Sequence, residues 1–177
     1  MKPRVAIVDY GAGNIRSVQQ AFIYLGAQVE LHSDPNRLQG FSHLVLPGVG
    51  SFPRAMRLIR SSGLDQLLRE RVDEGVPLLG ICLGMQLLAS RSSEGGETEG
   101  LGLIAGDVDR FDFDTTSSGL KIPHVGFDSV NPSSDSRLFF GFEEDVDFYF
   151  THSYRLRCAS GELVAAQAYY GEPYVAA

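Results

Sequence analysis

The stretch Gly80-Ile81-Cys82-Leu83-Gly84-Met85-Gln86 contains the strongest structural signal in the chain. It lies between a short apolar run, residues 76–79, and a segment with helical character that begins near Met85. A nucleophile on a sharp turn between a strand and a helix needs small residues two positions before and two positions after it, because a larger side chain would collide with the neighbouring backbone. Glycine occupies both of these positions around Cys82. The stretch therefore predicts an elbow that presents the Cys82 thiol.

The following helix directs its N-terminal N–H groups toward the Cys82 sulfur, which favours the thiolate over the thiol. The alternative interpretation is a buried cysteine at the end of a glycine-containing strand, because free cysteines often serve as small core residues. Cys158, the other cysteine, follows the strand-like residues 154–157, and we expect it to have a packing role. Two cysteines in such different contexts do not indicate a disulfide framework. Cys82 is therefore the candidate nucleophile.

Length and charge exclude several classes of protein. The 177 residues suffice for one well-buried α/β domain and are too few for two ordinary ones. The net charge of −7 argues against nucleic acid or an anionic membrane surface as the main partner. No apolar segment is long enough for a signal peptide or a transmembrane helix, so the expected location is the cytoplasm.

Two kinds of bound group are also disfavoured. The four histidines lack i, i+4 spacing and have no cysteine pairs nearby, which argues against a metal site; they are His32, His43, His124 and His152. Gly11-Ala12-Gly13 resembles the start of a dinucleotide fingerprint, but Arg16 stands where the third glycine is required. We therefore expect neither a metal nor a cofactor.

Strands and helices alternate in the first half of the chain. We expect strands at residues 4–8, 29–31, 43–46 and 76–79, and helices at residues 15–25, 55–59 and 64–72. This alternation implies a parallel sheet covered on both faces, with sites at the carboxyl ends of its strands. Glycine-rich loops follow Val8, Leu46 and Leu79, at those ends. The three loops should therefore converge.

The second half contains shorter β-prone runs. We expect strands at residues 101–104, 108–113, 148–151 and 163–170, and polar loops at residues 114–119 and 131–135. Residues 90–100, rich in Ser, Glu and Gly, predict a solvated surface loop. Residues 169–174 predict a hairpin connection, after which residues 175–177 would open the returning strand.

Taken together, these motifs resemble those of the class I, triad-type glutamine amidotransferases, and most closely those of the glutaminase subunits of imidazole glycerol phosphate synthases. The resemblance rests on residues 9–18, 46–56, 80–86, 100–111, 121–126 and 148–154, and thus covers essentially the whole chain. It implies a flavodoxin-like three-layer α/β fold, with a mostly parallel central sheet and added β-hairpins in the second half. The resemblance further implies hydrolysis of glutamine and, through the imidazole glycerol phosphate synthase subunits, a role in histidine biosynthesis.

The resemblance also implies roles for individual residues. Cys82 would attack the side-chain amide of glutamine to give a glutamyl thioester and ammonia. The backbone of Val49, Gly50 and Leu83 would supply the oxyanion hole. The residues expected to bind glutamine are Gly48, Gly50, Gln86, Ser153 and Tyr154. For Ser153 and Tyr154 the alternative interpretation is a turn at a strand end with a packed ring.

In the family, ammonia passes to a separate (β/α)8-barrel cyclase subunit, so the resemblance implies a heterodimer with such a barrel. The residues expected at this interface are Asn14, Phe52, His124 and Phe127. Phe127-Asp128 stands where the histidine-pathway subunits usually have Trp-Asn. This difference leaves one alternative open, a related amidotransferase subunit that supplies ammonia to another synthase, such as one acting on a surface-sugar precursor.

The triad histidine and acid of the family are absent from the sequence. In the family they lie in a Phe-His-Pro-Glu segment shortly after the counterpart of residues 171–177. The resemblance therefore implies a single amidotransferase domain over residues 1–177 that lacks its C-terminal strand and helix. Such a chain should show little glutaminase activity, because His152 lies in a segment that the family uses for substrate binding.

Two function classes remain as alternatives to an ammonia-donating glutaminase. One is a non-catalytic binding module that keeps the elbow without the triad. The other is a cysteine hydrolase on a related fold, such as a peptidase or a γ-glutamyl hydrolase. Gln86 and the Pro47-Gly48-Val49-Gly50 loop favour the glutaminase over the hydrolase.

Overall fold

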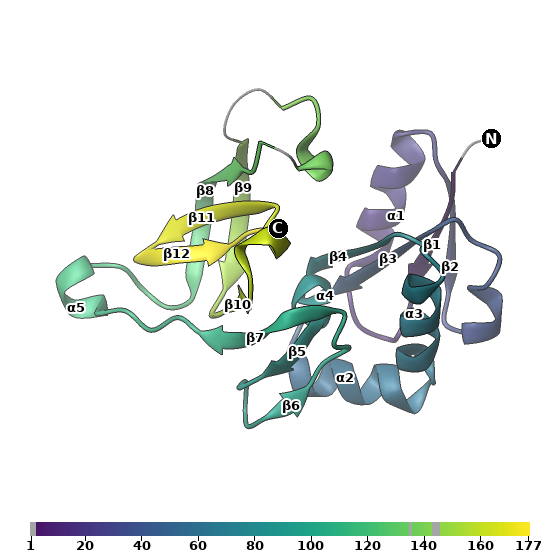
Figure 1. The fold of residues 1–177 in the computed structure, drawn as a ribbon, viewed down its shortest axis with the longest axis horizontal. Helices are drawn as coiled ribbons and strands as arrows, with labels where there is room; N and C mark the ends of the chain where they lie inside the picture. The colour runs from purple at the N-terminus through teal and green to yellow at the C-terminus, as the bar shows by residue number, and fades with distance from the viewer. Residues whose placement is uncertain (1–2, 135, 143–145) are drawn as a thin grey trace.

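The structure is a computed structural model that describes residues 3–134, 136–142 and 146–177. Its first half contains a four-stranded parallel sheet in the order β2-β1-β3-β4 (Figure 1). The strands are β1 (Arg4–Val8), β2 (Gln28–His32), β3 (His43–Gly48) and β4 (Leu78–Cys82). The predicted strands at residues 4–8, 29–31 and 43–46 are confirmed. The fourth strand begins two residues later than the predicted run at residues 76–79 and continues to the elbow.

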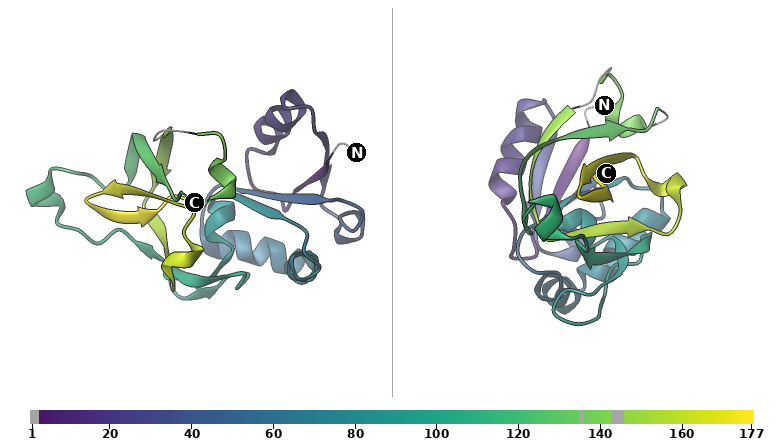
Figure 2. Two further views of the ribbon diagram at one scale, coloured as in Figure 1. Left: turned by 45° about the horizontal axis from the view of Figure 1, so that its top comes forward. Right: turned by 90° about the vertical axis from the view of Figure 1, so that its left-hand side faces the viewer.

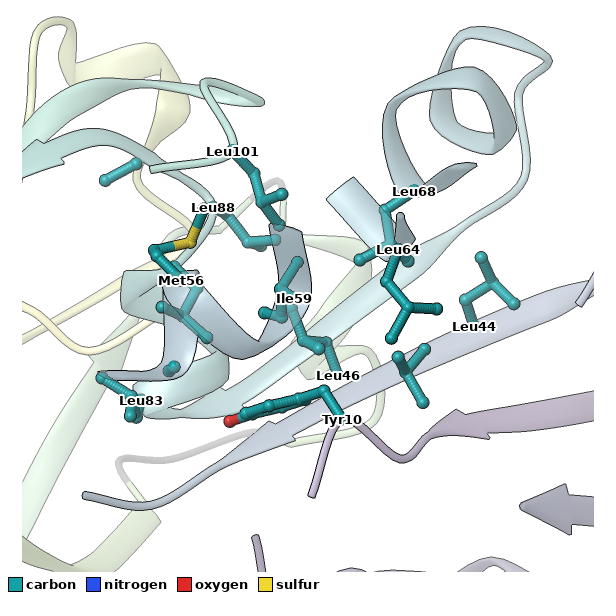
Figure 3. Close-up of a cluster of buried hydrophobic side chains, with 14 of the residues drawn as sticks. Tyr10, Leu44, Leu46, Met56, Ile59, Leu64, Leu68, Leu83, Leu88 and Leu101 are labelled. Atoms are coloured by element: carbon teal, nitrogen blue, oxygen red, sulfur yellow. The ribbon is translucent and has the colours of Figure 1, made fainter. Parts of the chain in front are cut away.

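Helices cover both faces of this sheet, as the alternation predicts. They are α1 (Ile15–Tyr24), α2 (Phe52–Ser61) and α3 (Leu64–Asp73). Neighbouring side chains of a strand point to opposite faces. Val5 and Ile7 of β1 therefore pack with Ile15 of α1. Ala6 and Val8 belong instead to the larger core formed with α2 and α3, part of which is drawn in Figure 3.

Two further four-stranded sheets form the second half. The sheet of order β10-β7-β5-β6 contains β5 (Ala89–Ser92), β6 (Thr98–Glu99), β7 (Ile104–Arg110) and β10 (Tyr154–Cys158). The sheet of order β12-β11-β8-β9 contains β8 (His124–Pro132), β9 (Val146–His152), β11 (Ala166–Tyr170) and β12 (Glu172–Val175). Both lie at one end of the parallel sheet, and the chain returns to the junction between the halves at Ala177 (Figures 1 and 2).

Two short α-helices and three 3₁₀ turns complete the described part of the chain. The helices are α4 (Leu83–Gln86) and α5 (Thr115–Ser118). The 3₁₀ turns are Pro35–Arg37, Arg137–Phe139 and Gly161–Leu163. Helix α4 begins directly after Cys82, rather than near Met85 as the sequence suggested.

Several predictions for the second half were wrong. Residues 90–100 are not an open loop, because β5 and β6 pair within them as a hairpin. The strand expected at residues 101–104 starts only at Ile104, and the one expected at residues 108–113 ends at Arg110. Parts of both expected runs instead belong to one continuous strand, β7, which pairs with β5 on one side and with β10 on the other.

The longest described strand, β8, was not predicted at all. Strand β8 extends through Asn131 and Pro132, so the first two residues of the loop expected at residues 131–135 are part of a strand. Asp135 lies outside the described residues. Residues 115–118 of the expected loop 114–119 form α5, whose N-terminal N–H groups are capped by the Asp114 carboxylate. The hairpin at residues 169–174 is confirmed, with Gly171 at its turn.

A buried ion pair ties the two sheets of the second half together. Arg155 of β10 is 3% exposed, and its guanidinium lies 2.7 Å from the carboxylate of Glu172 on β12. The same guanidinium donates to the carbonyl oxygen of Arg110 at 2.9 Å and lies over the ring of Phe111. Since a buried charge needs partners on all sides, these contacts fix how β12 approaches β7 and β10.

Candidate active site

The elbow predicted around Cys82 is present. Cys82 lies between β4 and α4 with a φ of 57°, and among the described residues no other non-glycine residue has a positive φ. An L-residue rarely adopts this conformation, which is held only where the surroundings impose it. The side chain of Cys82 is exposed. The thiol therefore lies exposed on a strained turn. The alternative interpretation, a buried core cysteine, is excluded.

The two glycines of the elbow are required by close contacts. A Cβ atom on Gly84 would lie 1.7 Å from the carbonyl oxygen of Leu46, and one on Gly80 would lie 2.6 Å from the Cα atom of Met85. Neither site has room for a methyl group without a shift of the backbone. The glycines two positions before and after Cys82 thus have the function that the sequence indicated.

The glycine-rich loops converge at the carboxyl edge of the sheet. A Cβ atom on Gly48 would lie 2.6 Å from the amide nitrogen of Gly84 and 2.9 Å from the Cβ atom of Leu83. On the other side, a Cβ atom on Gly13 would lie 3.6 Å from the carbonyl oxygen of Pro47. Gly48 itself is buried, whereas the following Val49 and Gly50 are exposed. This confirms the predicted convergence. Val49 and Gly50 are exposed at this edge of the sheet, next to the cavity described below but not among the residues that line it.

An apolar cavity of about 470 Å³ opens beside the elbow, where the two halves of the molecule meet. Cys82 and Gln86 line one side of it, and Tyr154 lines another. The side-chain amide nitrogen of Gln86 donates to the carbonyl oxygen of Tyr154 at 2.9 Å. Since this bond uses an N–H of the amide, the Gln86 carbonyl oxygen is left as an acceptor for a cationic or N–H group of a ligand.

His152 also bonds to the Tyr154 carbonyl oxygen, at 2.9 Å from its Nδ1 atom. A carbonyl can only accept, so Nδ1 carries the proton and Nε2 is the acceptor. The Nδ1 atom of His124 lies 3.3 Å from that Nε2 atom and donates to it. Both ring nitrogens of His152 are therefore occupied. His152 orients the carbonyl that holds Gln86 and is not free to take a proton from Cys82.

Both histidines are held in the neutral state. Burial lowers the pKa of His124, with a smaller opposing effect from the Asp128 carboxylate. Burial also lowers the pKa of His152, opposed by its bond to Tyr154 and reinforced by His124. The His124 ring stacks on Tyr170 with the ring centres 3.8 Å apart. An aromatic cluster of this kind stabilises an uncharged imidazole better than an imidazolium deprived of water.

This pair predicts a dependence of stability on pH. Since the folded-state pKa values lie below the ordinary value of 6.5, the unfolded chain binds more protons when the pH falls below that value. The contribution of the pair is complete above pH 6.5 and is lost as the pH falls toward the lowered folded-state values. We expect the thermal midpoint of unfolding to fall between pH 7.5 and pH 5 by less in a His124→Gln, His152→Gln double variant. A His43→Gln variant, changed outside the pair, should keep the full dependence; an unchanged dependence in the double variant would contradict this account.

The structure places the expected interface residues in two different environments. Phe127 is 75% exposed, and Asn14 is exposed at the start of α1. His124 and Phe52, in contrast, are 2% and 0% exposed. His124 is buried because its side of β8 faces the aromatic cluster, and Phe52 because it begins α2 with its ring in the main core. Neither side chain can contact a partner in this arrangement, so the prediction for these two residues was wrong.

Leu83, another of the predicted site residues, is the first residue of α4 and directly follows the nucleophile in the chain. Its side chain is buried. Ser153 is the single residue between β9 and β10, and its carbonyl oxygen accepts from the backbone N–H of Phe111 at 3.0 Å. Ser153 and Tyr154 thus do lie at a strand-end turn, and Tyr154 additionally lines the cavity.

Two residues near the site were not singled out from the sequence. Glu94, in the hairpin between β5 and β6, accepts from the backbone N–H of Phe52 at 2.8 Å and so caps α2. Its carboxylate lies beside the loop that contains Gly50. Tyr10 is buried under the same loop. Glu94 lay in a segment predicted to be solvated, and no periodicity marked Tyr10 within its polar loop.

Among residues 3–134, 136–142 and 146–177, no three His, Cys, Asp or Glu side chains are grouped so as to hold a metal ion. Within the same part of the chain, no helix is long and apolar enough to cross a membrane.

Known proteins that resemble this chain all point to the same family. The family model for class I glutamine amidotransferases matches residues 6–174. An imidazole glycerol phosphate synthase subunit HisH from Moorella thermoacetica is 44% identical over 171 residues, which cover 97% of this chain and 79% of that protein. A HisH subunit from Chlorobium luteolum is 48% identical over 150 residues, which cover 85% of this chain and 73% of that protein.

Solved structures agree on the fold. A crystal structure described as a glutamine amidotransferase superposes with a TM-score of 0.72 at 21% identity, covering 95% of this chain and 85% of the other. The PurLQS structure from Thermotoga maritima gives a TM-score of 0.71 at 20% identity, covering 97% of this chain and 78% of the other. The expected three-layer α/β fold with a central parallel sheet is therefore confirmed.

Proposed function

This chain belongs to the class I glutamine amidotransferases, and from that premise we propose that it is the glutaminase subunit of an imidazole glycerol phosphate synthase. Two subunits of that synthase, which are 44% and 48% identical to this chain, support the assignment to this synthase among the enzymes that use ammonia from glutamine. The observation that carries the chemistry is the exposed Cys82 at positive φ, on the wall of a cavity that it shares with Gln86. On this proposal the protein acts in the cytoplasm with the other enzymes of histidine biosynthesis.

The proposed reaction begins with attack of the Cys82 sulfur on the side-chain carbonyl carbon of glutamine. The carbonyl oxygen becomes an oxyanion, which accepts hydrogen bonds from the backbone N–H groups of Leu83 and of Val49 or Gly50. When the intermediate collapses, the C–N bond breaks and the nitrogen leaves as ammonia with an added proton. Water then hydrolyses the thioester to glutamate and the free thiol.

The substrate's other end fits the polar groups around the cavity. The α-amino group of glutamine is cationic, and two acceptors are available to it: the Gln86 carbonyl oxygen on the wall of the cavity and the Glu94 carboxylate beside the loop that contains Gly50. We propose that they bind this ammonium group, with the backbone of Ser153 and Tyr154 across the cavity.

The proton of the Cys82 thiol needs a base, and the four histidines of this chain do not supply one. His152 has both ring nitrogens bonded, and His124 is buried in the aromatic cluster. His32 bonds to Glu30 and His43 to Ser42, both outside the cavity. The base is therefore a group other than these histidines.

We propose that ammonia is passed to a (β/α)8-barrel subunit that docks on the exposed side of β8 and β9. Phe127 and Tyr149 face each other across these strands, with ring centres 5.2 Å apart, and are 75% and 59% exposed. Val125, two residues before Phe127, is also exposed. Contiguous exposed apolar side chains commonly mark a protein–protein interaction site. Phe148, Tyr149 and Phe150 of β9 also line the cavity. A partner at this position would thus bind directly beside the glutamine site.

This docking surface can be tested with one aromatic residue. We expect Phe127→Ala to weaken association with the barrel subunit by more than about 1 kcal/mol, because buried aromatic side chains contribute most to interfaces. Glutaminase activity, which we expect to depend on the barrel and its bound ligand, should need correspondingly more barrel for saturation. Titration calorimetry and a glutamate-release assay measure the two effects.

Tyr24→Ala provides the matched control, because Tyr24 is 91% exposed at the far end of α1. It should leave association unchanged. Equal binding by the Phe127→Ala variant and the unmodified chain would exclude this face as the docking surface. Full glutaminase activity without any barrel would contradict the proposed function itself.

A further inference from the structure

Tyr10 has a buried hydroxyl group that makes no hydrogen bond within the described part of the chain. The residue is 5% exposed and lies in the main hydrophobic core (Figure 3). Leaving a buried hydroxyl without a partner is unfavourable, and such groups in folded proteins are few. A phenylalanine would satisfy the packing of this core equally well, so packing alone does not account for the hydroxyl.

The Tyr10 hydroxyl lies between the loop that follows β3 and the elbow. A Cβ atom on Gly48 would be 2.9 Å from the Tyr10 oxygen and 2.9 Å from the Cβ atom of Leu83. In Figure 3 the Tyr10 oxygen points toward Leu83, the residue after the nucleophile. Burial, reinforced by the nearby Cys82 sulfur, raises the pKa of Tyr10 to about 12. The group is therefore a neutral hydrogen-bond donor at any working pH.

The geometry of a peptide unit connects this donor with the oxyanion hole. In a planar trans peptide the C=O and N–H bonds point in opposite directions. If the N–H of Val49 turns into the cavity to bind an oxyanion, the C=O of Gly48 must turn away from it, into the protein. A buried carbonyl needs a donor there. Because the Tyr10 hydroxyl lies beside Gly48, it is in a position to provide one.

We propose that Tyr10 is a positioning residue for the oxyanion hole. Its hydroxyl donates to the Gly48 carbonyl when glutamine occupies the site, and so holds the Val49 N–H toward the developing negative charge. The inference rests on the proposed function, because it assumes that a glutamine carbonyl enters the cavity beside Cys82. The glycines on either side of Val49 allow the loop to make this change, and Gly50 has a φ of 96°.

If Tyr10 has this role, a Tyr10→Phe variant should react more slowly at Cys82 without losing thermal stability. Removal of an unpaired buried hydroxyl should leave the thermal midpoint unchanged or raise it. The same variant should react more slowly with a glutamine-derived diazo ketone, whose ketone oxygen takes the place of the amide oxygen. Loss of one neutral hydrogen bond corresponds to a decrease of about three- to tenfold in that rate. Alkylation of Cys82 by iodoacetamide, which uses no oxyanion hole, should be unchanged.

Ser136→Ala is the matched control, because Ser136 also has a buried hydroxyl with no partner in the described residues and does not line the cavity. It should behave like Tyr10→Phe in thermal stability and like the unmodified chain in both reactions. The rate constants are measured by mass spectrometry of the Cys82 peptide, with and without the barrel subunit.

Each outcome of this experiment is informative. A selective decrease with the diazo ketone in Tyr10→Phe supports the inference. Equal rates in Tyr10→Phe and the unmodified chain overturn it while leaving the proposed function intact, and so does an equal decrease in Tyr10→Phe and the control variant. Failure of the diazo ketone to modify Cys82 in the unmodified chain overturns the proposed function together with the inference.

Discussion

In a protein that combines this chain with a general base for Cys82, replacement of Cys82 by alanine should abolish glutamine-dependent synthesis by the complex with the barrel subunit. We expect a loss of at least about 10⁴-fold, because removal of a covalent nucleophile eliminates the pathway and not merely one contact. Synthesis from added ammonium salts should remain, since it needs only the second active site. A coupled assay with either nitrogen source, at saturating barrel subunit, measures both activities.

Cys158→Ala is the matched control for this experiment. Cys158 is half-buried, burial raises the pKa of its thiol, and it packs against the main core. The variant should keep both activities. If Cys82→Ala retained glutaminase activity, the elbow would not present the nucleophile. If it also lost the ammonium-supported reaction, the change would have damaged the assembly and not only the chemistry.

Replacement of Gly84 by alanine should destabilise the protein by at least about 3 kcal/mol, the upper end of the usual effect of overpacking. The added methyl group would lie 1.7 Å from the carbonyl oxygen of Leu46, so either α4 or β3 must move. Such a movement also displaces Cys82, and we expect labelling of the thiol by glutamine analogues to be lost. Urea denaturation followed by circular dichroism measures the change in free energy of unfolding.

Gly161→Ala is the control for this second experiment. Gly161 lies in the 3₁₀ turn Gly161–Leu163, has no positive φ, and a Cβ atom there would meet no atom within 4 Å. It should change stability by less than about 0.5 kcal/mol. Equal stability of the Gly84→Ala and Gly161→Ala variants would mean that the elbow is not tightly packed against β3.

The sequence was sufficient to predict the first half of the fold because its local signals agree with one another. Strands β1 and β3 are short apolar runs followed by glycine-rich loops, and α1 has apolar residues at helical spacing. The elbow could be predicted because a strained turn restricts the residues on both sides of Cys82. At these positions the backbone requirement and the residue type coincide.

The second half could not be predicted equally well because its strands depend on distant partners. Strand β8 contains Gly126 and Pro132 and alternates only weakly between apolar and polar residues. It is stabilised by pairing with β9 and β11, which come later in the chain. Likewise β5 and β6 are polar and owe their strand geometry to the pairing with β7 and with each other.

The same limit applies to individual site residues. The burial of His124 depends on Phe150, Tyr170 and Tyr174, which come from three other strands, and no local pattern reveals such a cluster. Phe52 follows a glycine-rich loop, which suggested exposure, but helix α2 starts there and directs the ring inward. For His124 and Phe52 the residue types could be identified from the sequence, whereas their burial could not.

The central claim is that Cys82 is the nucleophile of a site that recognises glutamine. The most direct measurement is the mapping of modified peptides by mass spectrometry after reaction with the glutamine-derived diazo ketone, with and without competing glutamine. We expect a single adduct on Cys82, formed more slowly as glutamine is added. Modification of Cys158 instead, or modification of Cys82 at a rate that glutamine does not reduce, would contradict the account.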